Sequence, residues 1–278
     1  MGALITLTTD FGLKDGYVAA MKGVIASINP EAAIVDICHT IEPQNIKQAA
    51  FVFSTAYSYF PLNTIHVVVV DPGAGTDRRA IILKTPAANF IGPDNGVFSY
   101  VIDAFSPKPV KGSRLVKPGR QMRVYAITKS KYWRKPVSNT FHGRDIFAPV
   151  AAALSMGSDP SDFGEMVNTA MAFAISHPEY QGNMIKGNIL HIDNFGNLIT
   201  NIKESTLSEI GRAINITVSG CKITGLDRDY ADKQGPIALI GSSGYLEISL
   251  SNANIAELLK AKVGDDVLVK AQKSRKAG

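Results

Sequence analysis

Several residue types and patterns that define large protein classes are scarce or missing in this 278-residue sequence. It has two cysteines, Cys38 and Cys221, which make no disulfide framework, so we expect both to be free thiols. No apolar run approaches the roughly 20 residues that cross a bilayer, and residues 1–10 lack the basic start of a signal peptide. These absences predict a cytoplasmic protein without a membrane partner.

Motifs for common nucleotide and metal chemistries are missing as well. The turn that contains Gly73 and Gly75 lacks the third glycine of a dinucleotide fingerprint, and no Gly-Lys-Ser/Thr phosphate loop occurs. The five histidines show no paired spacing with one another or with the cysteines. Phosphoryl transfer is therefore disfavoured, and we expect neither a metal nor a cofactor.

The positive charge of the chain is concentrated in two segments. The net charge is +5, but ten basic residues and no acidic one lie between Ala104 and Gly143, and four more basic residues lie among the last nine. Without these fourteen residues the chain carries more acidic than basic side chains. The pI of about 9.1 is therefore a property of two segments and does not predict a nucleic-acid partner.

The first half of the sequence alternates short β-rich runs with helical patterns, which is typical of βαβ units on a mostly parallel sheet. Asp15 and Asp94 are the expected capping residues of two helices. Strands are expected at Ala3–Thr9, Ala33–Cys38, Thr64–Val70, Arg79–Thr85, Asn89–Ile91, Arg114–Val116 and Arg123–Thr128. Helices are expected at Asp15–Ser27, Asn45–Phe60, Asp94–Ala104 and Asp145–Met156.

The second half changes to short strands and turns with one good helix, which predicts a small β-barrel or sandwich. Residues 175–187 contain Pro178, Gly182 and Gly187 and suit a linker. We therefore predict an α/β domain at 1–174, a linker at 175–187 and a β domain with a basic tail at 188–278. The expected elements are strands near Gly187–Ile192, Asn197–Asn201, Ala213–Val218, Ile237–Ile240 and Tyr245–Ser249, and a helix at Ala253–Ala261.

Two carboxylates follow strands in the first half at positions where α/β proteins bind ligands. Asp10 follows the first expected strand and Asp71 the third, and each has a glycine within two residues. A helix or turn cap is the alternative role for either one. His142 lies in a polar loop before the last helix of this half, where its ring would titrate near neutrality.

The second half carries two polar turns of its own. The first is Asp193-Asn194-Phe195-Gly196-Asn197 and the second is Gly241-Ser242-Ser243-Gly244-Tyr245. Their carboxylate, amide, hydroxyl and aromatic groups suit the binding of an amino acid or a purine. Ordinary hairpin turns are the alternative interpretation.

Five motifs together point to one family. They are Thr8-Thr9-Asp10-Phe11-Gly12, Asp71-Pro72-Gly73-Ala74-Gly75-Thr76 with Arg78-Arg79, Gly92-Pro93-Asp94-Asn95-Gly96, Asn139-Thr140-Phe141-His142-Gly143-Arg144-Asp145 and Asp193-Asn194-Phe195-Gly196-Asn197. In this order they resemble the S-adenosyl-L-methionine hydroxide adenosyltransferases, which are relatives of the fluorinase and chlorinase. The resemblance runs from about residue 4 to residue 270. It implies a two-domain homotrimer that hydrolyses S-adenosyl-L-methionine to adenosine and L-methionine, with sites at subunit interfaces.

The resemblance also implies roles for individual residues. The catalytic trio maps onto Asp71, Arg78 and His142, and either Asp71 or His142 would take the proton from water. Arg79, one residue further on, should point to the other face of its strand. The implied substrate contacts are Asp10 and Phe141 with the ribose, Asp193 and Ser242 with the methionine group, and Phe195, Asn197 and the turn at Ser243 and Tyr245 with the adenine side.

Two other functions stay open at this stage. Halogenating relatives carry Tyr in place of Asp71 and lack His142, which argues against a nucleophilic halogenase. A sensor that binds adenosine or S-adenosyl-L-methionine would use the basic segment on nucleic acid, with a steep salt dependence. The basic segment itself, residues 107–136, is a candidate mobile flap.

Overall fold

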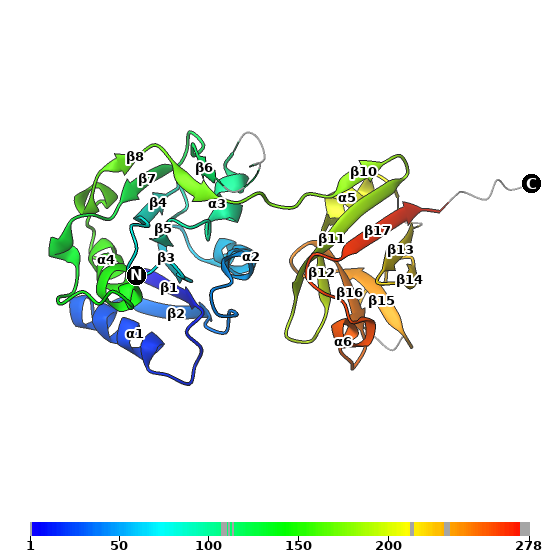
Figure 1. Ribbon diagram of the computed structural model, residues 1–278, viewed down its shortest axis with the longest axis horizontal. Helices are drawn as coiled ribbons and strands as arrows, with labels where there is room; N and C mark the ends of the chain where they lie inside the picture. Colours follow the sequence, from blue (N-terminus) through cyan, green and yellow to red (C-terminus); the bar gives the residue numbers. More distant parts are fainter. Residues whose placement is uncertain are drawn as a thin grey trace, which may run out of the picture. The chain divides into compact units, whose positions relative to one another are not determined.

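The computed structural model describes residues 2–106, 110, 112, 114–211, 214–230 and 234–272. The chain divides into two compact units, Met1–Ile175 and Ser176–Gly278, each with its own sheet (Figure 1). The fold is mixed α/β, with a mostly parallel first sheet and an antiparallel second sheet. None of the helices among the described residues is long and apolar enough to span a membrane.

The first unit is built on a seven-stranded sheet whose central strands are parallel. The pairs β2–β1, β1–β3 and β3–β5 are parallel, whereas β4 and β8 run in the opposite direction. The carboxyl ends of β1, β3 and β5 therefore meet at one edge of the sheet. The strand order is β2 (Ala33–Cys38), β1 (Leu4–Thr9), β3 (Thr64–Val69), β5 (Ala88–Pro93), β4 (Ala80–Lys84), β7 (Arg123–Ala126) and β8 (Met166–Val167).

Helices cover both faces of this sheet (Figure 1). Every residue of β3 is buried, and its side chains alternate between two apolar cores. Val67 and Val69 belong to the core with α1 (Tyr17–Ile28) and α4 (Ala148–Ser155). Val68 belongs to the core with α2 (Ile46–Ala56) and α3 (Ser99–Ala104). This two-sided burial is the reason why the strand is nearly all β-branched.

Most expected elements of the first unit are confirmed, but three of the expected helices begin at other residues. Gly16, not Asp15, precedes α1, and no side chain caps that helix. Asp94 caps nothing: it binds Arg79 and the amide of Met171, and α3 begins only at Ser99. The helix expected from Asp145 begins instead as a π-helical turn, η3 (Gly143–Phe147), which continues directly into α4.

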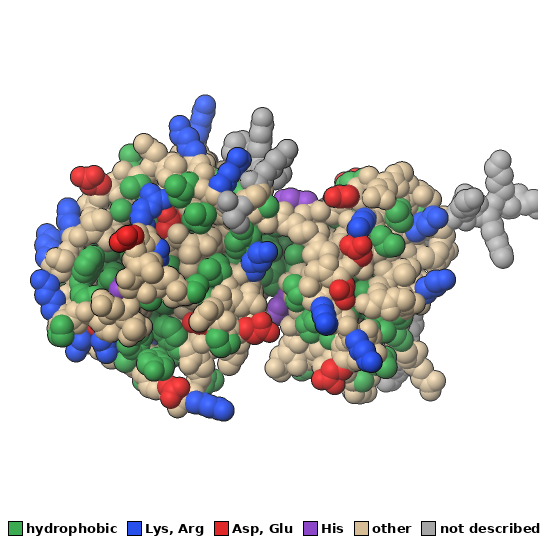
Figure 2. Space-filling view, in the orientation of Figure 1, with side chains coloured by type: hydrophobic (Ala, Val, Ile, Leu, Met, Phe, Trp, Pro, Cys, Tyr) green, Lys and Arg blue, Asp and Glu red, His purple; other side chains and the backbone are tan. Residues whose placement is uncertain are grey.

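Three short 3-10 turns connect the larger elements: η1 (Tyr57–Tyr59), η2 (Ser130–Tyr132) and η4 (Pro160–Phe163). β6 (Arg114–Val116) lies outside the main sheet and pairs with β9 (Ala170–Ala172). The expected flap at 107–136 falls partly outside the described residues. In the described part, the basic residues between 114 and 135 are all exposed, in keeping with the Lys and Arg side chains on the surface of this unit (Figure 2).

The second unit is an antiparallel, nearly closed barrel-like sheet. Its two outermost strands in the pairing order, β14 and β15, lie in contact. One apolar core fills it, with Ile189, Ile216 and Val269 fully buried. The order is β14 (Cys221–Thr224), β13 (Ile214–Val218), β17 (Asp266–Ala271), β11 (Met184–Ile192), β12 (Leu198–Lys203), β16 (Tyr245–Leu250) and β15 (Pro236–Ile240), with β10 (Glu179–Gln181) paired to β11. Two short helices are α5 (Glu204–Ser208) and α6 (Ile255–Leu259).

Three strands of this unit have no counterpart among the expected elements: β10, β14 and β17. Because β10 and the start of β11 lie inside residues 175–187, irregular chain in the expected linker ends at residue 178. The expected helix at Ala253–Ala261 is shorter, and Lys260 ends it in the left-handed conformation. The start of the expected strand at Ala213 and the basic tail from residue 273 lie outside the described residues.

Candidate active site

Asp10 follows β1 at the edge of the sheet where the parallel strands end. Its Oδ2 atom accepts a hydrogen bond from the backbone amide of Gln44 at 2.7 Å. Gln44 adopts a positive φ of 66°, which turns its amide toward the carboxylate. Gly12, with φ 68°, donates its own amide to the carbonyl of His39. The loops after β1 and β2 are thus joined around Asp10.

Asp71 follows β3, the neighbouring strand, and forms a two-point ion pair with Arg78. Arg78 Nε donates to Asp71 Oδ1 at 2.8 Å, and an Nη atom donates to Oδ2. The side chains are only 5% and 12% exposed, so the pair is largely shielded from water. Arg79 instead donates from Nε to Asp94 at 2.9 Å, as expected for successive residues that enter a strand.

His142 completes this group. Its Nδ1 lies 2.8 Å from the same Arg78 Nη2 that binds Asp71. Because a guanidinium can only donate, Nδ1 must accept, and the hydrogen of the neutral ring sits on Nε2. Burial and the Arg78 charge lower the pKa of His142, while the Asp71 and Asp145 charges raise it in part. The net shift is downward, so the ring is neutral at pH 7.

Close backbone contacts bring the His142 loop to the other two motifs. Gly75 has φ 79°, and a Cβ there would lie 2.5 Å from the carbonyl oxygen of Asn139. A Cβ on Gly143 would lie 3.3 Å from the ring of Phe11. The glycines therefore let the loop at 139–143 pack between the turn after β3 and the turn after β1.

Phe141 belongs to an aromatic group beside this trio. Its ring centroid lies 5.7 Å from that of Phe11 and 5.3 Å from that of Tyr17, both edge to face. The Arg144 guanidinium lies over the Phe141 ring at 4.9 Å. Phe141 is thus fixed next to His142, which suits the predicted contact with a ribose, although its role stays a prediction.

In the second unit, the Asp193 carboxylate accepts hydrogen bonds from residues of its own turn. Its Oδ1 accepts the amides of Phe195 and Asn197, and its Oδ2 accepts the Asn197 side chain, each at 2.9 Å. Phe195 is 75% exposed at the tip of this turn, whereas Asn197 is buried. The exposed ring is available for stacking, and the carboxylate keeps lone pairs for a ligand.

The second polar turn, with Ser242, Ser243 and Tyr245, connects β15 to β16. Within this turn, the Gly244 amide donates to the carbonyl of Gly241. In the β12–β16 ladder, Leu198 pairs with Ile248 and Lys203 with Tyr245. The turn at 193–197 therefore lies at one end of this ladder and the turn at 241–244 at the other, so the structure does not join them into one cluster.

Comparisons with known proteins decide the family. The model of the SAM hydroxide adenosyltransferase N-terminal domain matches residues 5–164, and that of the C-terminal domain matches residues 187–268. The chain belongs to the SAM hydroxide adenosyltransferase family. Its two compact units each contain one of these family domains.

Several relatives match nearly the full length of the chain. The (R)-S-adenosyl-L-methionine hydrolase of Methanocaldococcus jannaschii is 36% identical over 95% of this chain and 94% of the relative. The enzyme of the same name from Thermus thermophilus is 33% identical over 92% and 95%. A fluorinase of Nocardia brasiliensis is more distant, with 24% identity over 96% of each. A crystal structure of an uncharacterized conserved protein from Thermotoga maritima has a TM-score of 0.85, with 32% identity over 96% and 99%.

A cavity of about 470 Å³ in the first unit has no counterpart among the sequence-based expectations. Gln44, which lines it, donates its amide to Asp10, and Asn95 donates to the carbonyl of Val70, directly before Asp71. Two lining residues therefore contact the segments that carry Asp10 and Asp71, although neither carboxylate lines the cavity itself. It is lined by Gln44, Asn45, Ile46, Lys47, Asn95, Met171, Ala172 and Phe173. The motif Gly92–Gly96 was the available signal for Asn95.

Proposed function

We propose that this chain hydrolyses S-adenosyl-L-methionine to adenosine and L-methionine by attack of water on the ribose 5′ carbon. The observation that carries the proposal is the hydrogen-bonded trio of Asp71, Arg78 and His142. The hydrolase names of the relatives at 33% and 36% identity support it. Those names specify the R configuration at the sulfonium, and we extend this preference to the present chain.

The reaction needs an aligned water more than a strong base, because the sulfonium is already a good leaving group. As the bond from the water oxygen to the 5′ carbon forms, the bond from carbon to sulfur breaks, and its electron pair stays on the sulfur of methionine. The protein must hold the water in line and receive one proton. Neither task calls for a metal or a cofactor.

The geometry favours Asp71 as the proton acceptor. Arg78 occupies Nδ1 of His142, and Nε2 already carries the hydrogen, so the neutral ring donates to the water oxygen and orients it. Asp71 uses one lone pair on each oxygen for Arg78 and keeps others free to accept a proton from water. Arg78 thus connects the orienting group to the accepting group.

The substrate contacts follow from the same assignment. Asp10 would accept the ribose hydroxyls and Phe141 would pack on the sugar. In the second unit, Phe195, Asn197, Ser243 and Tyr245 would contact the adenine side, and Asp193 and Ser242 would bind the methionine group. The proposal includes a cytoplasmic homotrimer with sites at subunit interfaces, for which light scattering of the purified protein is the direct measurement.

The main competing function is nucleophilic halogenation on the same fold. Fluorinases match at 22% to 24% identity, well below the hydrolases. Asp71 and His142 stand where the halogenating relatives are expected to differ, and an ionised carboxylate would repel a halide. We therefore favour water as the nucleophile.

Product analysis in ¹⁸O-labelled water tests the proposal. Purified protein is incubated with the R and S sulfonium epimers separately, with chloride and fluoride present. We expect adenosine and methionine from the R epimer, with one ¹⁸O atom in adenosine, and no halogenated nucleoside. Asp71→Asn and His142→Ala should lower kcat at least 100-fold, whereas His177→Ala, at an exposed histidine, should not. Active His142→Ala, or no adenosine from fresh protein, contradicts the proposal.

A further inference from the structure

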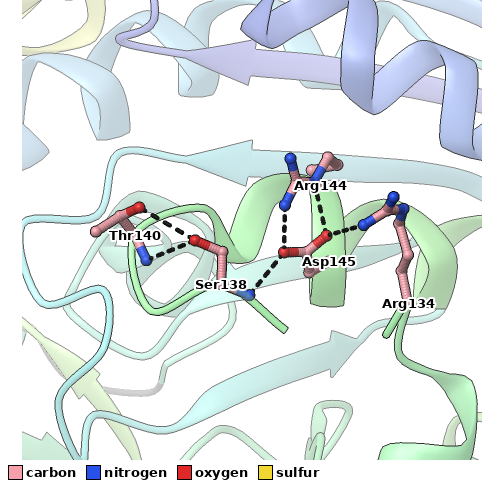
Figure 3. A network of polar contacts seen from close by, with 5 residues as sticks. All are labelled: Arg134, Ser138, Thr140, Arg144 and Asp145. Atoms are coloured by element: carbon pink, nitrogen blue, oxygen red, sulfur yellow. Dashed lines mark hydrogen bonds and ion pairs between the residues drawn. The ribbon is translucent and has the colours of Figure 1, made fainter. Parts of the chain in front are cut away.

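Asp145 is a buried carboxylate that the proposed reaction does not use. Its side chain is fully buried, yet it is held by two arginines and a backbone amide (Figure 3). Arg144 donates from Nε and Nη2 to the two oxygens at 2.7 Å each, and Ser138 donates its amide at 2.9 Å. Arg134 approaches at 3.4 Å. Burying a charge is costly unless it is paired in this way, so the arrangement calls for an explanation.

The contacts of Asp145 close the loop that carries His142. The Asp145 carbonyl accepts the amide of Arg134 at 2.9 Å, and its amide donates to the carbonyl of Phe141 at 3.2 Å. Its side chain holds Ser138, whose hydroxyl in turn accepts the amide of Thr140 at 3.2 Å (Figure 3). One residue therefore binds the loop at its start, its middle and its end.

The same residue holds the aromatic neighbour of His142. Arg144, fixed on Asp145 by its two hydrogen bonds, lies over the Phe141 ring. His142 stands between Phe141 and the π-helical turn that contains Asp145. The backbone on both sides of His142 is thus anchored to one carboxylate.

We propose that Asp145 is the positioning residue of His142: through Arg144 and Ser138 it fixes the loop that presents the imidazole to Arg78. The inference rests on the proposed function. It adds a residue that affects activity without belonging to the trio of Asp71, Arg78 and His142. Three charged groups affect the pKa of the ring: Asp71 after β3, Arg78 before β4, and Asp145 in η3.

Electrostatics agrees with this geometry. The Asp145 charge raises the pKa of His142, against the lowering by burial and by Arg78. Burial alone would raise the pKa of Asp145, but the hydrogen bonds from Arg144 and Ser138 outweigh it and lower that pKa. Asp145 is therefore ionised at the pH where His142 titrates. A substitution that removes the Asp145 charge must therefore change the pKa of His142.

Two variants with opposite electrostatic effects test the proposal. Asp145→Asn removes the negative charge, so the pKa of His142 and the acidic limb of kcat should move to lower pH. Arg144→Gln removes the positive charge that partly neutralises Asp145, so both should move to higher pH. Because the loop loses hydrogen bonds in each variant, kcat at pH 8 should fall about 10-fold to 100-fold, with a much smaller change in KM.

An NMR titration of His142 supplies a readout that does not depend on activity, so failure of this inference is separable from failure of the proposed function. Asp94→Asn is the matched control, because Asp94 is also a buried carboxylate on an arginine but does not face His142. It should lower the melting temperature without moving the His142 titration. Unchanged or same-direction titrations in Asp145→Asn and Arg144→Gln overturn the inference; Arg144, which is partly exposed, keeps the test valid if Asp145→Asn fails to fold.

Discussion

Arg78 is the residue that connects the parts of the site. It binds Asp71 through two nitrogens, donates to His142, and lies over the ring of Phe147 at 5.3 Å. A guanidinium can do this because its donors form a rigid planar fork, which a lysine ammonium does not. The site thus depends on the shape of this cation as well as on its charge.

Arg78→Lys should therefore lower kcat at least 100-fold although the charge is kept. The ammonium can pair with Asp71 but cannot also hold Nδ1 of His142, so the imidazole loses its orientation. Steady-state kinetics with S-adenosyl-L-methionine measures the effect. Arg79→Lys, at the neighbouring arginine that binds Asp94, is the control and should lower kcat less than 10-fold. Equal losses in both variants would contradict this account.

At the residue scale, sequence reasoning found what spacing and chemistry encode. The pairing of Asp71 with Arg78 follows from seven residues around a glycine turn, and the divergence of Arg79 follows from strand alternation. The anchoring role of Asp145 could not be predicted, because its partners Ser138 and Arg134 depend on how an irregular loop folds back. For the same reason the sequence predicts a helix cap at Asp94, whose actual partners are Arg79 and the amide of Met171.

Among the elements, the turn after β3 and the loop before η3 act as one piece. The positive φ of Gly75 places its backbone against Asn139, with no room for a side chain. Gly157 also has a positive φ, 95°, but a Cβ there would meet nothing within 4 Å. The two glycines share the same conformational demand and differ in what surrounds them.

Gly75→Ala and Gly157→Ala should consequently separate two effects, backbone strain at a positive φ and displacement of the loop at 139–142. Gly157→Ala should lose about 1 kcal/mol of unfolding free energy because alanine disfavours a positive φ, and Gly75→Ala should lose more because its methyl group also meets the Asn139 carbonyl. Only Gly75→Ala should also lose activity, by more than 10-fold, since its methyl group pushes the loop at 139–142 away from Arg78. Denaturant unfolding and kcat measure the two effects. Full activity in Gly75→Ala would show that the contact is irrelevant to catalysis.

Element prediction succeeded where apolar side chains carry a clear period and failed where they do not. The continuous β-branched run of β3 gave nearly its true bounds. β10 is short, polar and exposed, so it has no apolar signal. β14 pairs with β13 across a two-residue turn, Ser219-Gly220, with φ values of 45° and 79°; the Ser-Gly pair was an available hairpin signal. In β17, the apolar run Val267-Leu268-Val269 is only three residues long and has a charged residue on each side, so its signal is weak.

For the molecule as a whole, the centre of the first unit contains a titratable group. His66 of β3 is 1% exposed, lies 2.8 Å from the Thr6 hydroxyl and stacks on Phe90. Burial lowers its pKa from 6.5 to about 4. The unfolded chain therefore binds this proton more readily than the folded one, and folding loses free energy as the pH falls from 6.5 to about 4.

The unfolding free energy should thus drop by about 2–3 kcal/mol from this residue alone between pH 7 and pH 4.5. Chemical denaturation at both pH values measures the drop. In His66→Gln, which does not titrate and keeps an acceptor for Thr6, the drop should be smaller by that amount. The lowered pKa of His142 adds to the loss in both proteins, so the difference between them isolates His66. The same drop in His66→Gln would refute this assignment.

The π-helical turn at Gly143–Phe147 also affects how this chain is compared with others. The hydrogen bonds of a π turn join residues i and i+5, so such a turn contains one more residue than an α turn. A homologue with a regular helix at this point would be one residue shorter. A sequence alignment that misplaces the resulting gap would pair His142 with the wrong residue of that homologue. Superposition on the β3 strand and the α4 helix gives the correct correspondence.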